Sequence, residues 1–311
     1  MKLSRKFLND YIDINDISIQ KLAEDMTSIG NEYDFCGKLI NATNLTIGEV
    51  VECTNHPDSD HLHVCKVNIG SEILNIVCGA PNVRKGIKVI VAKDGAVLPG
   101  GIIKKGVIRG VESNGMLCSI EELGLEHKFL KKEDIEGICE LNQDAPIGGD
   151  PIQYLELDDE VIDFELTSNR GDLLSILGMA YEIGALYNRD IKDINLNYPK
   201  VAKKMDDFNL EINTNRCSLF LAKKALNVEI KESPLFIQRR LMSSGIRPIN
   251  NVVDISNYVM LETGQPLHFY DADRLGNTLI VRDAKENEKL ITLDNTLRTL
   301  SRDRKSTRLN S

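Results

Sequence analysis

The residues near the end of the chain that could do chemistry are one arginine, one asparagine and one histidine. They lie in the segment GIRPINNVVDISNYVMLETGQPLHFYD, residues 245–271, as Arg247, Asn257 and His268. Arg247 follows a predicted helix, where a guanidinium can grip a phosphate or a carboxylate. His268 follows Pro266 in a rigid turn. Taken alone, these residues are weak evidence, because a surface arginine and a structural histidine explain them more simply.

A second cluster of this kind is His56-Pro-Asp-Ser-Asp-His-Leu-His63. His61 and His63 would share one face of a strand, and imidazole together with carboxylate suits zinc. The proline and the two aspartates are also the residues that a tight turn favours. The turn explains the cluster without an ion, so we predict no metal site.

Small groups of basic residues could contact the phosphates of a nucleic acid. The net charge of −9 argues against a general nucleic-acid coating protein, which would be basic overall. A specific contact depends on local patches instead, although each of these residues could also be a solvated loop charge. The candidates are Arg84, Lys85 and Lys88 in one group, Lys104, Lys105 and Arg109 in a second, and Lys128, Lys131 and Lys132 in a third.

Short strands separated by turns must position these cations. Between residues 41 and 150, glycine-rich turns punctuate apolar runs, and Ile87, Val89 and Val91 alternate as in a strand. Many short strands without intervening helices predict a small closed barrel. Phe129 is the only aromatic residue of this stretch, so any RNA contact must rest on the backbone and on RNA shape rather than on base stacking.

The segments on either side of this stretch follow α/β patterns. Ser18 is a good N-cap for a helix that Gly30 ends. Residues 161–166, VIDFEL, predict a strand, and an apolar stripe over residues 176–187 predicts a long helix.

Two further helices and a pair of strands are predicted towards the end of the chain. Ser233–Pro234 opens a helix that Gly245 closes, and a second helix covers 251–262. Strands at about 278–283 and 288–293 predict a hairpin or a meander.

Composition places the chain among globular proteins of two or three domains. It has 311 residues, of which 42% are hydrophobic and 27% charged. No apolar run is long enough to span a bilayer, and the N-terminus lacks a signal core, so we expect a cytoplasmic protein. The seven cysteines contain no C-x-x-C pair and are expected to be thiols in a reducing compartment.

Four segments, in this order, resemble the β subunits of bacterial phenylalanine–tRNA synthetases. MKLSRKFLNDYIDI resembles their opening, and HPDSDHLHVCKVNIG, VCGAPNVRKG and SNGMLCSIEELGL resemble their OB-fold tRNA-binding domain. DFELTSNRGDLLSILGMAYEIGAL resembles their T-P-N-R segment, and GIRPINNVVDISNYVMLETGQPLHFYD resembles their editing domain. The likeness reaches about residue 302. Ser168 replaces the proline of T-P-N-R, and Asn68 replaces a common aspartate.

This resemblance implies a multidomain α+β fold. Residues 1–40 and 151–190 would form one split ferredoxin-like α/β domain, into which an OB-fold β-barrel of residues 41–150 is inserted. A linker at 191–207 would lead to a partial α/β editing domain of the B3/B4 type at 208–302. The tail DRKSTRLNS, residues 303–311, matches a translated sequencing adapter and is expected to be non-native.

The resemblance also implies the reaction and the partners. Such a β subunit works with an α subunit in an (αβ)2 tetramer, a class II ligase that attaches phenylalanine to tRNA(Phe) at the expense of ATP. ATP and Mg2+ would bind the α subunit, and this chain indeed has no P-loop. We expect this chain, as a C-terminally truncated subunit, to bind no cofactor, DNA or membrane.

The resemblance also implies a role for the residues of the 245–271 segment. Arg247, Asn257, Pro266 and His268 would line a site that hydrolyses mischarged Tyr-tRNA, because a second site can select tyrosine through its hydroxyl. Arg247 would position the charged or 3′-terminal part of the substrate, and His268 would orient the ester or the water. The acidic residue that accepts the tyrosine hydroxyl would lie downstream, so this chain alone is expected to be inactive in editing.

Two rival interpretations stay open. The chain could be a non-catalytic tRNA-binding OB-fold module or chaperone, or an interaction subunit whose barrel never touches RNA. The segment that carries His268 favours the enzyme subunit, because a simple binding module has no need of it. Salt-dependent binding of tRNA would separate the interaction subunit from the others.

Overall fold

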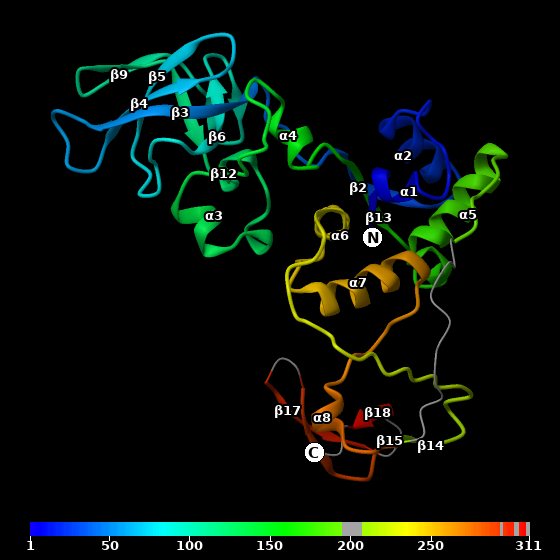
Figure 1. Ribbon diagram of the computed structural model, residues 1–311. Helices are drawn as coiled ribbons and strands as arrows, with labels where there is room; N and C mark the ends of the chain where they lie inside the picture. The colour runs from blue at the N-terminus through cyan, green and yellow to red at the C-terminus, as the bar shows by residue number, and fades with distance from the viewer. Residues whose placement is uncertain (195–206, 293–294, 302–304, 309–311) are drawn as a thin grey trace. The chain divides into compact units, whose positions relative to one another are not determined.

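The computed structural model describes residues 1–194, 207–292, 295–301 and 305–308 (Figure 1). The chain divides into two compact units, residues 1–194 with 231–267, and residues 195–230 with 268–311. Most of the predicted linker, residues 195–206, lies outside the described residues. The predicted partial editing domain, 208–302, is shared between both units. No helix of the described ranges is long and apolar enough to cross a membrane.

The first unit contains a three-stranded antiparallel sheet built from both sides of the predicted barrel segment. Its strands are β1 (Lys2–Ser4), β13 (Glu160–Glu165) and β2 (Glu32–Lys38), in the order β1-β13-β2. Leu3 lies opposite Ile162, so β13 is the central strand. The chain therefore leaves this sheet after β2 and returns to its middle more than a hundred residues later.

Helices α1 (Arg5–Leu8), α2 (Ile19–Ser28) and α5 (Ile176–Tyr187) pack on this sheet. The predicted start of α2 is confirmed, because the Ser18 hydroxyl accepts a hydrogen bond from the Lys21 amide at 3.2 Å. Gly30 follows the helix with φ of +94°, which favours glycine. The common core of these elements includes Leu3, Phe7, Leu8, Ile12, Leu22, Met26, Ile162, Phe164, Met179, Ala180 and Ile183.

Two later helices, α6 (Leu235–Ser243) and α7 (Asn251–Thr263), belong to the same unit. Both confirm the helices predicted from the sequence. The ring of Tyr258 on α7 stacks on Phe7 with centroids 4.6 Å apart. The Arg240 guanidinium lies 5.1 Å from the Phe7 ring and donates to the Tyr258 hydroxyl at 2.7 Å. Aromatic and cation–π contacts therefore attach this helix pair to α1.

Residues 45–141 supply a six-stranded antiparallel sheet with the path β11-β6-β3-β4-β5, and β12 also pairs with β6. A β-bulge between Val50 and Glu52 interrupts the pairing of β3 with β4. Two separate two-stranded hairpins, β7–β8 and β9–β10, accompany the sheet. The bounds are β3 Leu45–Asn55, β4 His63–Asn68, β5 Ile73–Cys78, β6 Lys88–Lys93, β7 Val97–Leu98, β8 Gly101–Ile102, β9 Gly106–Ile108, β10 Val111–Ser113, β11 Gly115–Cys118 and β12 Glu140–Leu141.

The predicted closed barrel is wrong, because no ladder of the described strands joins β5 to β11. Residues of β10, which immediately precedes β11, bridge this seam through side-chain hydrogen bonds instead. The Asn75 side chain donates to the Glu112 carbonyl at 2.8 Å, and the Ser113 hydroxyl accepts from the Val77 amide at 3.1 Å. One backbone bond, from Asn114 to the Asn75 carbonyl at 2.8 Å, spans the seam. Polar side chains therefore take the place of backbone partners there.

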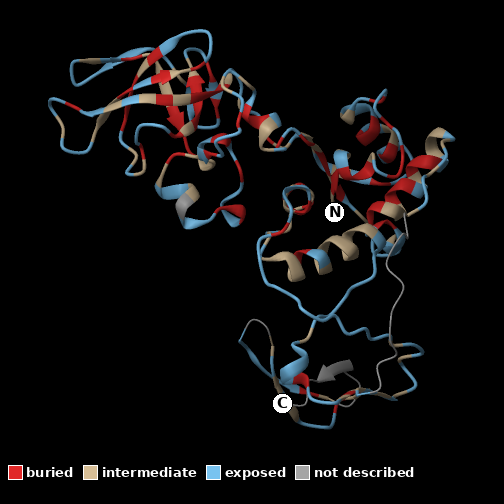
Figure 2. Ribbon diagram, in the orientation of Figure 1, coloured by how far each residue is buried: buried red, intermediate tan, exposed pale blue. Residues whose placement is uncertain are grey.

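The alternation of Val89 and Val91 predicted a strand, which is confirmed as β6, and this strand is buried on both faces. Val89 and Val91 pack in one core with Cys65 of β4 and Ile76 of β5. Its other face packs in a second core, which residues 118–157 cover. Short elements supply this cover, namely η1 Glu121–Leu123, η2 His127–Phe129, α3 Lys132–Glu136 and α4 Pro151–Tyr154. Figure 2 shows the sheet interior buried and the β9 hairpin exposed.

The second unit is a smaller α/β element. Strand β14 (Asn209–Asn213) pairs in parallel with β15 (Thr278–Asp283), and β18 (Lys305–Arg308) pairs antiparallel with β15. A separate hairpin joins β16 (Glu288–Ile291) to β17 (Leu297–Leu300). The two predicted strands are confirmed as β15 and β16, but the predicted hairpin or meander is wrong, because β15 pairs with β14 and β18 whereas β16 pairs with β17.

The second unit also contains a short helix and part of the C-terminal tail. Helix α8 (Ala272–Leu275) begins at Asp271, whose side chain accepts from the Asp273 amide. The tail predicted to be non-native lies partly outside the described residues, and its described part is β18.

Candidate nucleic-acid interface

The first predicted cation group lies at the start of β6, and two of its members are engaged within the chain. Arg84 pairs with Glu140 at 2.6 Å. Lys88 donates through Nζ to the carbonyls of Gln143 and Ala145, each at 2.6 Å. Lys85 is exposed and forms no ion pair with any described residue. Lys88 therefore stabilises the turn that follows β12, and Lys85 is the member that is open to an outside anion.

The second group lies on and before the β9–β10 hairpin. Lys104 and Lys105 are exposed, and neither forms an ion pair within the described part of the chain. Arg109, at the tip of the hairpin, has φ of +46° and donates through Nη1 to the Asp58 carbonyl at 3.1 Å. Arg109 thus ties the hairpin to the β3–β4 turn. Lys104 and Lys105 therefore carry most of the unpaired positive charge of this second group.

The histidine cluster forms that β3–β4 turn. His56 is only 3% exposed; its Nδ1 accepts from the Asp58 amide at 3.1 Å, and its Nε2 lies 3.2 Å from the Ile108 carbonyl. His61 lies in the turn rather than on the strand that begins at His63. Within the described ranges, no three His, Cys, Asp or Glu side chains are arranged to hold a metal ion. The turn geometry accounts for the cluster.

Polar turn residues of the resemblance also have structural partners. Asn82 binds the backbone of Ile138 twice, donating to its carbonyl at 2.8 Å and accepting from its amide at 3.0 Å. Ser113 spans the β5–β11 seam, because its hydroxyl also donates to the Gly115 carbonyl at 3.0 Å. These two side chains are held in place by the fold and are not available as free RNA contacts.

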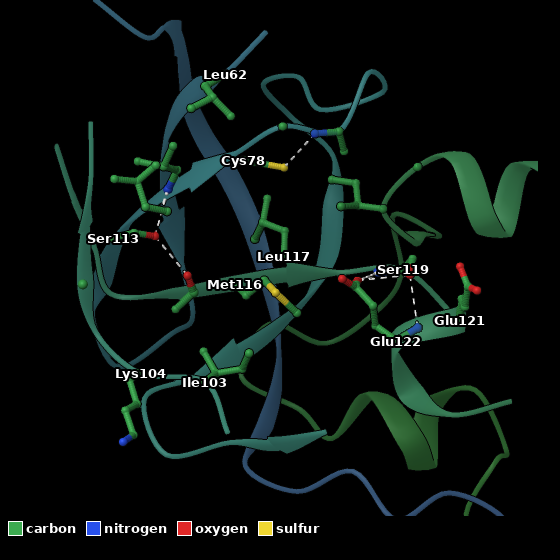
Figure 3. Close-up of a pocket in the computed structure, with 18 of the residues that line it drawn as sticks. Leu62, Cys78, Ile103, Lys104, Ser113, Met116, Leu117, Ser119, Glu121 and Glu122 are labelled. Atoms are coloured by element: carbon green, nitrogen blue, oxygen red, sulfur yellow. Dashed lines mark hydrogen bonds between the residues drawn. The ribbon is translucent and has the colours of Figure 1, made fainter. Parts of the chain in front are cut away.

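A cavity of about 630 Å³ lies beside the seam, between the end of β5, the β8–β9 segment and β11 (Figure 3). Its walls are mainly apolar, with Leu62, Ile103, Met116 and Leu117 among them, and Lys104 lies at its edge. The acids that line it are engaged. Glu122 accepts from the Ser119 amide at 2.7 Å, and Glu121 lies 2.8 Å from His127.

The third cation group is neutralised by neighbouring acids. Lys128 pairs with Glu126 at 2.8 Å, and Lys132 lies 3.5 Å from Glu136. Hydrogen bonds from Lys128 and then Lys2 hold the pKa of Glu126 below its usual value. Lys131 bonds Glu232 at 2.5 Å. This group therefore presents little unpaired charge.

The residues predicted for editing are divided between the two units. Arg247 and Pro266 are exposed and Asn257 is half-buried, and all three belong to the first unit. His268 is exposed and belongs to the second unit. The best-defined polar contact here is Asp254, which is 1% exposed and accepts from Ser233 at 2.5 Å and from the Ile249 amide at 2.7 Å. It holds the loop that carries Arg247 against α7.

The T-S-N-R segment builds a local framework that residue types alone did not assign. Arg170 pairs with Asp172 and with Glu182 on α5, each at 3.0 Å. Ser175 caps α5 by accepting from the Gly178 amide at 3.0 Å. The sequence signals only the cap, because Ser175 precedes Gly178 by three residues, whereas the pair of Arg170 with Glu182 depends on the folded turn before α5.

Two family models match this chain, the putative tRNA binding domain over residues 45–150 and the B3/4 domain over residues 216–306. Phenylalanine–tRNA ligase β subunits are similar over nearly all of it. Those of Bacillus cereus, Bacillus subtilis and Geobacillus kaustophilus are 44%, 45% and 46% identical over 306, 311 and 312 residues. The alignments cover 96–97% of this chain and 38% of each relative, so the chain spans about two-fifths of their length.

Proposed function

Since the chain belongs to the bacterial phenylalanine–tRNA ligase β subunits, of which it spans 38% of the length, we propose that it supplies tRNA binding to such a ligase. Its partner would be an α subunit in an (αβ)2 tetramer that attaches phenylalanine to tRNA(Phe). ATP and Mg2+ would be held by the α subunit. Residues 45–150 would carry the tRNA contact.

The observation that carries this proposal is the free charge beside the β9–β10 hairpin. Lys104 and Lys105 are exposed and unpaired among the described residues, although the chain as a whole carries −9. The other cations of residues 45–150 are largely engaged with acids or carbonyls. An anionic backbone would therefore meet this chain first at the two lysines and at Lys85.

Replacing both lysines, Lys104→Gln with Lys105→Gln, should weaken tRNA binding and flatten its salt dependence. The slope of log affinity against log salt should fall by about 0.7–0.9 for each lysine that neutralises a phosphate. Fluorescence anisotropy with labelled tRNA at several salt concentrations measures both quantities.

Two matched variants control this experiment. Lys38→Gln removes another exposed charge, on β2 and outside residues 45–150, and should leave the slope unchanged. Lys88→Gln should also leave it unchanged, because that ammonium is committed to two carbonyls. An unaltered slope in the Lys104/Lys105 double variant would rule out this hairpin as the contact.

The second part of the proposal is editing. The chain would contribute part of a site that hydrolyses mischarged Tyr-tRNA, with Arg247, Asn257, Pro266 and His268 in its lining. Support comes from the B3/4 match over residues 216–306, which spans all four positions. Arg247 would hold the substrate's anionic part, and His268 would orient the ester or the water.

Arg247→Ala and His268→Ala, placed in the complete tetrameric enzyme, should each slow deacylation of Tyr-tRNA at least about tenfold, because a misplaced ester or water reacts slowly. Charging with phenylalanine should be preserved. Arg274→Ala and His61→Ala are matched controls, since both residues are exposed and lie outside the proposed lining. Normal tyrosine clearance in the two test variants would remove these residues from the site.

A further inference from the structure

Two cysteines face each other across neighbouring strands of the sheet. Cys53 on β3 lies directly opposite Cys65 on β4 in the strand register. Their sulfur atoms are 3.8 Å apart, and both cysteines are free thiols. The β-bulge of β3 ends at Glu52, so the register is regular from Glu52 to the turn.

The position of this pair in the ladder suits a covalent link. The His56 amide donates to the Leu62 carbonyl at 2.9 Å, which makes His56 and Leu62 a hydrogen-bonded pair. Because pairs alternate along an antiparallel ladder, Cys53 and Cys65, three steps away, form a non-hydrogen-bonded pair. The Cα atoms of such pairs are about 4.5 Å apart, which lies within the range that disulfides span. The spacing of such a pair is therefore compatible with a disulfide.

The two thiols differ in access. Cys53 is half-buried, whereas Cys65 is fully buried in the core of the sheet. Burial, and then the neighbouring Cys53, raise the pKa of the Cys65 thiol. Cys78 on β5 is also buried and near enough to influence Cys65, but it lies opposite His63 in the register. Cys53 is therefore the thiol that a dissolved reagent reaches first.

We propose that Cys53 and Cys65 are a reversible thiol-oxidation site that a low-molecular-weight disulfide converts to a cross-strand disulfide. The Cys53 thiolate attacks one sulfur of the reagent, forms a mixed disulfide and releases one reagent thiol. The Cys65 sulfur, after losing its proton, attacks the Cys53 sulfur and releases the second reagent thiol. Two protein thiols are oxidised and one reagent disulfide is reduced to two thiols.

The link would close the β3–β4 hairpin just before its turn. That turn carries His56 and Asp58, which contact Ile108 and Arg109 of the β9–β10 hairpin. Oxidation would thus restrict the opening of the segment that supports this hairpin. The site itself does not depend on tRNA binding, so it can be tested on the 311-residue chain alone.

Peptide mapping tests the proposal directly, because trypsin leaves Cys53 and Cys65 in one peptide, residues 39–66. The folded chain is incubated with oxidised glutathione, denatured, alkylated with iodoacetamide and digested. Most of this peptide should carry no alkyl group and be lighter than the free dithiol by two hydrogens. Prior reduction with dithiothreitol should restore both alkylation sites.

Cys65→Val and Cys65→Ala should each leave glutathione on Cys53, and circular dichroism checks that the variants fold. The half-buried Cys36 and Cys217 serve as internal controls, which should form at most glutathione adducts. Three outcomes in the wild-type chain would overturn the proposal: a stable glutathione adduct on Cys53, a link from Cys53 to Cys78, or an unmodified peptide 39–66.

Discussion

Replacing Phe7 with alanine should lower the free energy of unfolding of the first unit by about 3–5 kcal/mol, the usual cost of removing a buried phenylalanine. Phe7 is 0% exposed and belongs to the core that β1, α2, β13 and α5 share. Its ring also carries the stacked Tyr258 and the Arg240 guanidinium. One truncation would therefore leave a cavity in the core and remove the ring that joins α7 to α1. Urea unfolding followed by circular dichroism measures the loss.

Phe35→Ala is the matched control, because Phe35 lies on β2 of the same sheet and is 46% exposed. Its loss should be well under half of that for Phe7, since less apolar surface returns to water. Equal losses for the two variants would mean that Phe7 is not the junction described here. Tyr258→Ala should reproduce part of the Phe7 effect, and the two changes should not be additive because the rings touch.

Gly178→Ala should cost about 3 kcal/mol of stability, the upper part of the range for overpacking. A Cβ at this position would lie 1.9 Å from the Asp172 carbonyl oxygen, which is backbone and cannot move aside. Alanine elsewhere in a helix is better than glycine by about 1 kcal/mol, so a loss here has the opposite sign to helix propensity. Thermal and urea unfolding of the variant both measure it.

Gly171→Ala provides the comparison, because a Cβ at Gly171 would meet no atom within 4 Å. Its stability should stay within about 0.5 kcal/mol of the parent chain. A stable Gly178→Ala variant would show that the Asp172 turn can relax. The steric requirement explains why a glycine stands three residues after the capping Ser175 in the T-S-N-R segment.

Helix boundaries could be predicted from the sequence because their causes are local. Ser18 and Gly30 bracket α2, and Gly245 and Gly264 end the later helices with positive φ. Each signal acts over one helical turn, which a single segment contains. The same reasoning identified residues 41–150 as a stretch of short strands.

Strand pairing could not be predicted in the same way, because partners lie far apart in the chain. The parallel partner of β15 is β14, some seventy residues earlier, so adjacency in the sequence suggested a wrong hairpin. The open seam between β5 and β11 depends on hydrogen bonds of Asn75 and Ser113. The alternation of Val89 and Val91 correctly indicated that one face of β6 is buried. It could not indicate that residues 118–157 bury the other face.

The candidate interface was predicted at the level of residue type and no further. Nine cations in three groups were chosen because phosphate needs positive charge, and the sequence cannot show that Lys88 and Arg109 donate to backbone carbonyls. Engagement of a side chain depends on its neighbours in space. The structure therefore reduces the set to Lys85, Lys104 and Lys105, which binding experiments can now rank.

The strand order β1-β13-β2 determines the order in which parts of the chain can fold during synthesis. The two outer strands emerge first from the ribosome, yet they cannot pair with each other, because their central partner is made only at residues 160–165. Residues 45–141 have all their strand partners by then and can fold earlier. Such long-range closure slows folding and leaves the early strands unpaired. Nascent chains halted before residue 160 should accordingly have a protected inserted sheet and a protease-sensitive N-terminus.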